Sequence, residues 1–165
     1  MAAQVATIGE PGHDGMGDHS IGQYRLADVL GYQLAMAAIT TSLVFSREVG
    51  ETLQLRPVEY SILALVHEQP RLTPARLASA LSVTAPNITA WMGKLERRGL
   101  VFRKTSDTDR RAQLLELTAE GDRLYREGTR RLIDGERAML STLSQGEYTL
   151  LKELLRKVAA ARRTP

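Results

Sequence analysis

Apolar residues recur at steps of three and four along most of this chain, the spacing that gives an α-helix one apolar face. The pattern predicts a long first helix over residues 21–52 and a shorter one over residues 58–68 that begins after Pro57. Arg56 is a poor cap for this second helix, where Ser or Thr would be expected. The repeating positions of the long helix are Leu26, Leu30, Leu34, Ala37, Ile39, Thr41, Val44 and Phe45.

Two short helices, joined by a tight break, are predicted next. Thr73 caps the first, over residues 74–80, and a proline occupies its first helical position. Thr84 caps the second, over residues 85–98, which ends at Gly99, a residue that readily becomes left-handed. The other side of the second helix carries small and polar residues, which suits close approach to another surface. Its apolar side consists of Ile88, Trp91, Met92 and Leu95.

After Gly99 the period of the pattern changes to two, the period of a β-strand. Residues 101–105 and 113–117 are predicted as the strands of a hairpin whose tip is residues 106–111. Two helices joined by a short turn and followed by a basic hairpin form a winged helix-turn-helix. The core of this unit is predicted to span residues 55–118.

Two further helices complete the chain. Thr118 caps a predicted helix over residues 119–142, whose apolar stripe is sparse and includes Met139. Ser144 and Glu147 form the S-x-x-E pattern of a capping box, which opens a final helix. The apolar face of that last helix consists of Tyr148, Leu151, Leu154, Leu155 and Val158.

The last helix has more apolar surface than one small domain needs. We therefore predict a dimer interface that combines this surface with the first helix, where Leu26 and Leu30 lie. The dimerisation helices then span residues 21–52 and 119–163. Packing of the last helix within its own chain is the alternative.

The distribution of charged residues distinguishes a winged helix-turn-helix that binds DNA from one with a purely structural role. Residues 94–111 contain seven basic and three acidic side chains, a net charge of +4, whereas the whole chain of 165 residues has a net charge of +3. A basic concentration where a recognition helix ends and a hairpin begins is expected for binding to a phosphate backbone. A solvated charged face is the alternative interpretation.

Three segments, in this order and at this spacing, resemble the MarR family of bacterial transcriptional regulators: LTPARLASAL, KLERRGLV, and DTDRRA leading into LELTAEG. The resemblance implies a MarR-like domain over residues 21–165. Its fold would be mainly α with a small β hairpin, a winged helix-turn-helix flanked by N- and C-terminal dimerisation helices. The function implied is that of a homodimeric repressor bound to a pseudo-palindromic operator in double-stranded DNA.

The predicted DNA contacts lie on the second short helix and on the hairpin. The amide of Asn87 suits the edge of an adenine. The resemblance places Arg111 in the minor groove and gives Asp109 a bracing role, with Arg110 as the competing arginine. Ala90 stands where many relatives carry an arginine, which shifts the weight of base readout to Asn87, Thr89 and the hairpin. The predicted contacts are Thr84, Pro86, Asn87, Thr89, Lys94, Arg98, Arg103, Lys104, Asp109, Arg110 and Arg111.

Relatives in this family are commonly released from DNA by small phenolic or aromatic carboxylate ligands. These ligands bind between the dimerisation helices and the DNA-binding domain. Arg47, Tyr60 and His67 are candidate contacts for such an effector by residue type alone. We expect no cofactor and no metal, because His13 and His19 match no defined ligand spacing.

Composition argues against several other functions. The chain has no cysteine, so it cannot be a thiol-based peroxide sensor. No Ser-His-Asp, Cys-His or carboxylate-metal arrangement indicates an enzyme. A winged-helix module for protein or RNA contact without operator specificity stays open as the alternative, although RNA recognition usually requires stacking aromatics and only 5% of the residues are aromatic.

The N-terminal segment and the length of the apolar runs give an expectation for where the protein is located. Residues 1–20 are glycine-rich and contain three acidic residues but no lysine or arginine, so they are predicted to form a flexible acidic tail. No apolar run approaches the ~20 residues of a membrane span, and the N-terminus lacks the pattern of a signal peptide. We therefore expect a cytoplasmic protein with no membrane partner.

Overall fold

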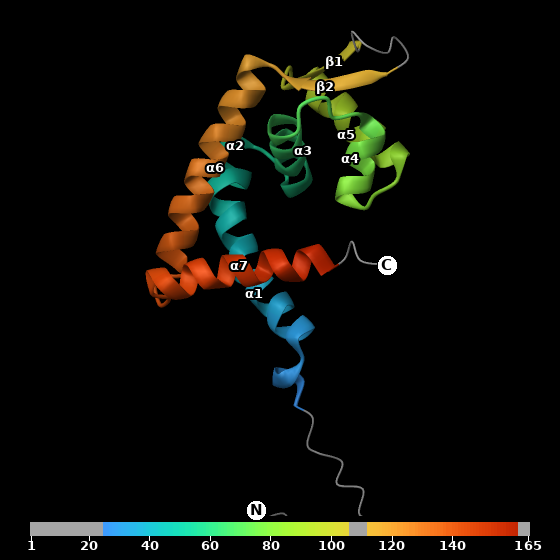
Figure 1. Ribbon diagram of the computed structural model, residues 1–165. Coiled ribbons are helices and arrows are strands. Elements are labelled where there is room, and N and C mark those ends of the chain that lie inside the picture. Colours follow the sequence, from blue (N-terminus) through green and yellow to red (C-terminus); the bar gives the residue numbers. More distant parts are fainter. Residues whose placement is uncertain (1–24, 106–111, 162–165) are drawn as a thin grey trace, which may run out of the picture.

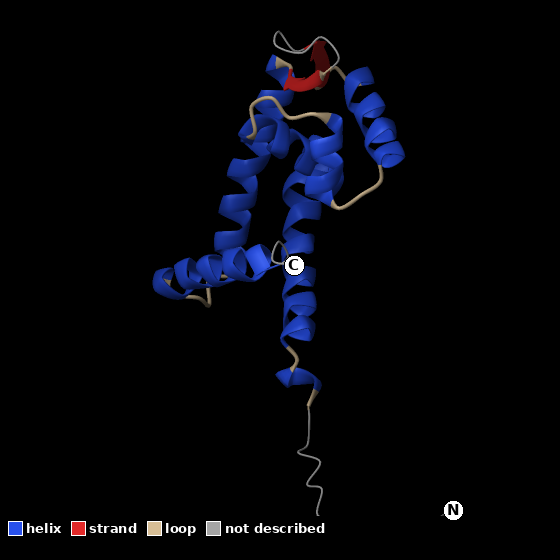
Figure 2. Cartoon of the chain, turned by 45° about the vertical axis from the view of Figure 1, so that its right-hand side comes forward, coloured by secondary structure: helices blue, strands red, loops and turns tan. Residues whose placement is uncertain are grey.

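The computed structural model describes residues 25–105 and 112–161. α3, α4, α5 and the hairpin gather at one end, α1 and α7 lie toward the other, and α6 runs between them (Figure 1). Helices dominate, and the two strands form one antiparallel hairpin (Figure 2), as the sequence predicted. The elements are η1 (Leu26–Asp28), α1 (Leu30–Phe45), η2 (Ser46–Gly50), α2 (Glu51–Leu53), α3 (Pro57–Glu68), α4 (Pro74–Leu81), α5 (Ala85–Arg97), β1 (Val101–Thr105), β2 (Gln113–Leu117), α6 (Ala119–Met139) and α7 (Gln145–Ala161).

One apolar core joins α3, α4, α5, the hairpin and the first turns of α6. The predicted apolar side of α5 is confirmed, since Ile88, Met92 and Leu95 are buried and Trp91 is half-buried. The N–H of Leu115 donates to the carbonyl of Leu72 at 2.9 Å, which ties β2 to the loop between α3 and α4. The hairpin is thereby fixed to the same core as the recognition helix. The side chains with the least exposure include Leu55, Ile62, Leu63, Leu72, Leu77, Ile88, Met92 and Leu95.

Local capping decides where most helices begin. The Oγ1 atoms of Thr73 and Thr118 each accept a hydrogen bond from the N–H three residues later, at 3.3 and 3.0 Å. Ser144 and Glu147 exchange both bonds of the predicted capping box, at 2.8 and 3.3 Å. Thr84 differs from the prediction: it occupies the N-cap position, but its side chain accepts no capping hydrogen bond.

The first helix begins later than predicted and changes its winding. Residues 21–24 lie outside the described part, Leu26–Asp28 is a 3₁₀ turn, and Val29 is extended, so the α-helix starts at Leu30. Ser46–Gly50 then forms a π turn. A 3₁₀ turn repeats every three residues, so apolar spacing alone does not distinguish it from the start of an α-helix.

The contact face of α6 also differs from the prediction. The helix ends at Met139, which is 39% exposed, instead of running to residue 142. Gly121, Gly128 and Gly135, spaced by seven residues, are buried against the rest of the chain. A Cβ on Gly121 would lie 1.9 Å from the carbonyl oxygen of Leu100. Leu124 is also buried and Leu132 packs against the core, so this face combines the small glycines with part of the sparse apolar stripe that the sequence predicts.

Several predictions concern residues outside the described part. They are the acidic tail over residues 1–20, with His13 and His19, and the hairpin tip over residues 106–111. Within residues 25–105 and 112–161, no helix is long and apolar enough to cross a membrane. The same residues contain no group of three or more His, Cys, Asp or Glu side chains placed to hold a metal ion.

The packing of Gly121 gives a stability prediction. Gly121→Ala should lower the free energy of unfolding by about 1 to 3 kcal/mol, because the new methyl group would collide with the Leu100 carbonyl. Gly146→Ala is the matched control, since a Cβ at Gly146 meets nothing within 4 Å. Urea unfolding of both variants measures the difference, and equal stability of the two would contradict the close approach of α6.

Candidate DNA-binding surface

The polar side of α5 faces solvent at the end of the molecule that also carries the hairpin (Figure 1). The turn that leads into α5 is tight: Ser82 is left-handed, with φ of 55°, and the N–H of Val83 donates to the carbonyl of Ala78 at 3.0 Å. Pro86 is tolerated in the first helical turn because the N–H groups there lack helical acceptors. The exposed residues on this side are Thr84, Ala85, Pro86, Asn87, Thr89 and Ala90.

The polar side chains of Thr89 and Asn87 on this surface differ in whether their hydrogen-bonding groups are already used within the protein. The hydroxyl of Thr89 donates to the carbonyl of Ala85 at 3.1 Å, so its proton is used within the helix. The amide of Asn87 has no hydrogen-bond partner among residues 25–105 and 112–161. A free carboxamide offers the donor and acceptor that together match an adenine edge. Asn87 is therefore the side chain best suited to contact a base.

Three predicted cationic contacts make ion pairs within the chain. Exposed pairs of this kind contribute little stability and are weakened by salt, so phosphates can compete for the two on the hairpin. The pair on α5 differs because its carboxylate is buried, with 8% side-chain exposure. The pairs are Arg98–Glu59 at 3.2 Å, Arg103–Glu96 at 2.9 Å and Lys104–Glu116 at 3.6 Å.

Lys94 and Arg97 are exposed near the end of α5, and neither makes an ion pair within the described part of the chain. Arg97 was absent from the predicted contacts, which included its neighbour Arg98 instead. Two residues correspond to about 200° around a helix, which places Arg97 almost opposite the buried Leu95. The exposure of Arg97 could therefore have been predicted from the helical periodicity of the sequence.

The hairpin extends from the core beside α5. Its strands pair from Val101 with Leu117 to Thr105 with Gln113, which confirms the predicted antiparallel pairing. Val101 is buried, whereas the remaining residues of β1 are exposed. The predicted minor-groove residues Asp109, Arg110 and Arg111 lie outside the described part.

The three candidate effector contacts lie in different surroundings. Arg47 is exposed on the π turn and pairs with Glu48 at 2.8 Å. The Tyr60 hydroxyl shares a 2.8 Å hydrogen bond with Thr129 Oγ1, and burial raises the pKa of Tyr60 while this bond partly opposes the rise. His67 Nδ1 lies 2.7 Å from an Asp122 carboxylate oxygen. Tyr60 and His67 thus both connect α3 to α6.

A hollow of about 440 Å³ lies where α1 and the π turn meet the start of α3. The residues that line it are both apolar and charged, and the charged ones are Arg56, Arg98 and Glu59. None of the predicted effector residues lines this hollow. Its other lining residues are Ser42, Phe45, Ser46, Gly50, Gln54, Leu55 and Pro57.

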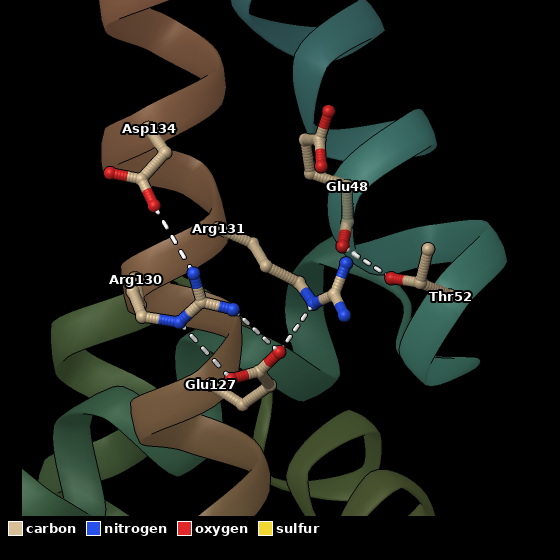
Figure 3. A network of polar contacts seen from close by, with 6 residues as sticks. All are labelled: Glu48, Thr52, Glu127, Arg130, Arg131 and Asp134. Carbon is tan, nitrogen blue, oxygen red and sulfur yellow. Dashed lines mark hydrogen bonds and ion pairs between the residues drawn. The ribbon is translucent and has the colours of Figure 1, made fainter.

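A charged network on α6 faces the π turn and α2 (Figure 3). Glu127 accepts hydrogen bonds from Arg131 Nε at 2.6 Å and from Arg130 Nη2 at 2.9 Å. These bonds hold the pKa of the Glu127 carboxyl below its usual range. Arg131 reaches toward the segment that carries Glu48 and Thr52, where the Thr52 hydroxyl donates to the Glu48 carbonyl. The network lies along the junction between α6 and the first helical segment.

Apolar surface is exposed at the opposite end of the molecule. No residue of α7 is buried, and Leu154 is 47% exposed. Leu26 and Leu30 are also exposed, each at 61%. An apolar hollow of about 510 Å³ separates α7 from α1 and the end of α6; burial raises the pKa of Glu136 on its wall, and Lys152 partly opposes the rise. Other exposed apolar residues include Val29, Met36, Ile39, Leu43, Leu150, Leu151, Leu155 and Val158.

The MarR family profile matches residues 55–112, which include α3, α4, α5 and β1. The HTH-type transcriptional regulator FarR of Neisseria gonorrhoeae is 31% identical over 132 residues, which cover 74% of this chain and 90% of FarR. Among solved structures, the transcriptional repressor CouR bound to a 23-mer DNA duplex has a TM-score of 0.72 and 26% identity, covering 88% of this chain and 99% of CouR.

MarR from E. coli in its apo form also shares the fold, with a TM-score of 0.67 and 24% identity over 79% of this chain and 96% of that structure. The relatives are transcriptional regulators, which agrees with the prediction that this chain is not an enzyme. The family profile, the extent of the match to FarR and the shared fold lead to one conclusion: the chain belongs to the MarR family of winged helix-turn-helix transcriptional regulators.

Proposed function

We propose that this protein is a cytoplasmic homodimeric repressor that binds a pseudo-palindromic operator in double-stranded DNA. The main support is the exposed polar side of α5, where the amide of Asn87 and the cations Lys94 and Arg97 have no polar partner within residues 25–105 and 112–161. An amide for base edges beside cations for phosphates is the combination that sequence-specific recognition requires. The 26% identical CouR is described as a repressor and was solved on a DNA duplex, which supports this reading.

The proposed dimer forms through α1 and α7. Their exposed leucines make an apolar surface that a second copy of the chain would cover. A twofold-symmetric dimer presents two copies of α5, so it fits an operator with two related half-sites in successive major grooves. The hairpins would then reach the adjacent minor grooves.

We also propose that a small aromatic acid acts as effector in the hollow of about 440 Å³ beside α3. Its volume lies within the range of small-molecule sites. Phe45 and Pro57 supply apolar walls, and the guanidinium group of Arg56 can bind a planar carboxylate. Titration of substituted benzoates into the DNA complex, followed by release of the labelled duplex, tests this assignment.

The experiment that tests operator binding is fluorescence anisotropy with duplexes tiled across the upstream region of the gene, at two salt concentrations and against a scrambled duplex. Selective binding with one dimer per duplex would support the proposal. Weak binding that salt removes equally from every duplex would contradict it. That outcome would favour the alternative of a module for protein or RNA contact.

Base reading by Asn87 gives the first prediction for this surface. Asn87→Ala should weaken operator binding by about 1 to 3 kcal/mol and leave binding to the scrambled duplex unchanged, because the amide reads a base and not a phosphate. Gln145→Ala is the control, since it removes an exposed amide from α7, away from α5 (Figure 1). Equal losses on operator and scrambled duplexes would refute a base contact.

The hairpin tip gives a second prediction. Arg111→Ala should weaken operator binding by more than ~1 kcal/mol, because a narrow minor groove concentrates negative potential around an inserted guanidinium. Anisotropy titrations at fixed salt measure this loss. Arg110→Ala is the matched comparison and should have the smaller effect; the reverse order would move the groove contact to Arg110.

The dimer surface gives a third prediction. Leu154→Asp should convert the dimer to a monomer and reduce operator affinity at least about tenfold, because the two half-sites are then no longer bound together. Sedimentation velocity and anisotropy measure the two effects. Thr149→Asp is the control, since Thr149 lies on the opposite side of α7 from the leucine stripe. A Leu154→Asp protein that remains dimeric would exclude this surface.

A further inference from the structure

Glu59 is the one charged residue that is buried within residues 25–105 and 112–161, with 6% exposure. It lies in the first turn of α3, directly after Pro57 and Val58. A buried carboxylate is costly unless hydrogen bonds and an opposite charge compensate for the lost water. The partners of Glu59 therefore show what this residue holds in place.

Both partners bind the same carboxylate oxygen. The backbone N–H of Arg56 donates to Glu59 Oε2 at 3.0 Å, which caps the start of α3. Arg98 Nη1 donates to that oxygen at 3.2 Å from 39 residues away in the chain. Arg98 is the C-cap residue of α5, and Gly99, with φ of +66°, turns the chain from there toward β1. Glu59 thus links the start of α3 to the end of the recognition helix.

The two neighbouring arginines at this end of α5 have different surroundings. Both arginines are exposed, but Arg98 pairs with Glu59, whereas Arg97 makes no ion pair within the described residues. An arginine committed to a buried carboxylate is held by the protein, while a free one can move to meet a phosphate. Arg97 is thus the natural comparison for Arg98.

We propose that Glu59 and Arg98 are a positioning pair for DNA recognition. The pair fixes the last turn of α5 against α3 and so sets the angle at which the polar side of α5 meets the base edges. Arg98 acts through this contact, and phosphate binding at this end of α5 falls to Arg97. The inference rests on the proposed operator binding.

A substitution of Glu59 can distinguish a positioning role from a purely electrostatic one, because the two roles predict opposite changes in operator affinity. Glu59→Gln removes a negative charge close to the DNA-binding surface while keeping the shape of the side chain. If charge alone mattered, affinity for every duplex would rise. If the pair positions α5, operator affinity falls about tenfold and affinity for scrambled DNA does not fall, because only base reading needs the correct angle.

The experiment compares Glu59→Gln, Arg98→Met, the double variant and Arg97→Met on operator and scrambled duplexes over a range of salt. We expect both single variants of the pair to lose operator selectivity without a change in salt slope, and the double variant to be no worse than either one. Arg97→Met should weaken both duplexes and lower the salt slope by about 0.9, the value for one lost phosphate contact. The proposal would be overturned if the losses of operator affinity in Glu59→Gln and Arg98→Met added up in the double variant, or if Arg98→Met lowered the salt slope.

Hydrogen exchange measured in the absence of DNA tests the positioning role of the pair independently of the proposed operator binding. Amide hydrogen exchange in the last turn of α5 should become about tenfold faster in Glu59→Gln and Arg98→Met than in the wild type or Arg97→Met. Unchanged exchange in all variants would overturn the pair as a positioning device. If the wild type selects no duplex, the proposed function fails, while the exchange rates still decide whether the pair fixes α5.

Discussion

The close approach of α6 to the rest of the chain is the constraint on which this structure depends. Three glycines at steps of seven residues lie close to other segments: Gly121 to the Leu100 carbonyl, Gly128 to the Tyr60 ring, and Gly135 to the side chains of Glu48 and Val44. A Cβ at the first would overlap backbone, which cannot move aside as a side chain can. Because α6 runs from the hairpin to the start of α7, these contacts relate the DNA-binding end of the molecule to its apolar end (Figure 1).

α3 lies at the end of the molecule that carries α4, α5 and the hairpin, and it makes polar contacts with both α6 and the end of α5. Its contacts with α6 use the predicted effector residues Tyr60 and His67, so these side chains already have structural roles. Its polar contact with the end of α5 is the ion pair between the buried Glu59 and the partly exposed Arg98. A ligand in the neighbouring hollow would touch this pair, which lines it. The contacts with α6 are Tyr60–Thr129 at 2.8 Å, Tyr125–Glu68 at 3.1 Å and His67–Asp122 at 2.7 Å.

The structure shows which of the basic residues between positions 94 and 105 form ion pairs within the protein. Counting residues 94–111 gives an excess of positive charge, but it does not show which cations are available to a partner. Arg103 and Lys104 are paired at the surface, where salt and phosphates compete with their carboxylates. Arg98 pairs with the buried Glu59, whereas Arg97 makes no ion pair within the part of the chain that the structure describes. The distribution of partners, more than the net charge, defines the candidate DNA contacts.

The elements that depend on local interactions could be predicted from the sequence: the paired strands, the apolar side of α5, the left-handed Gly99 and the caps at Thr73, Thr118 and Ser144. Each of these needs residues within about four positions or a simple period. Only tertiary packing decided which face of α6 buries its glycines and which side chain pairs with Glu59. Those features depend on which segments pack together, and residues 39 positions apart, such as Glu59 and Arg98, carry no local signal of their contact.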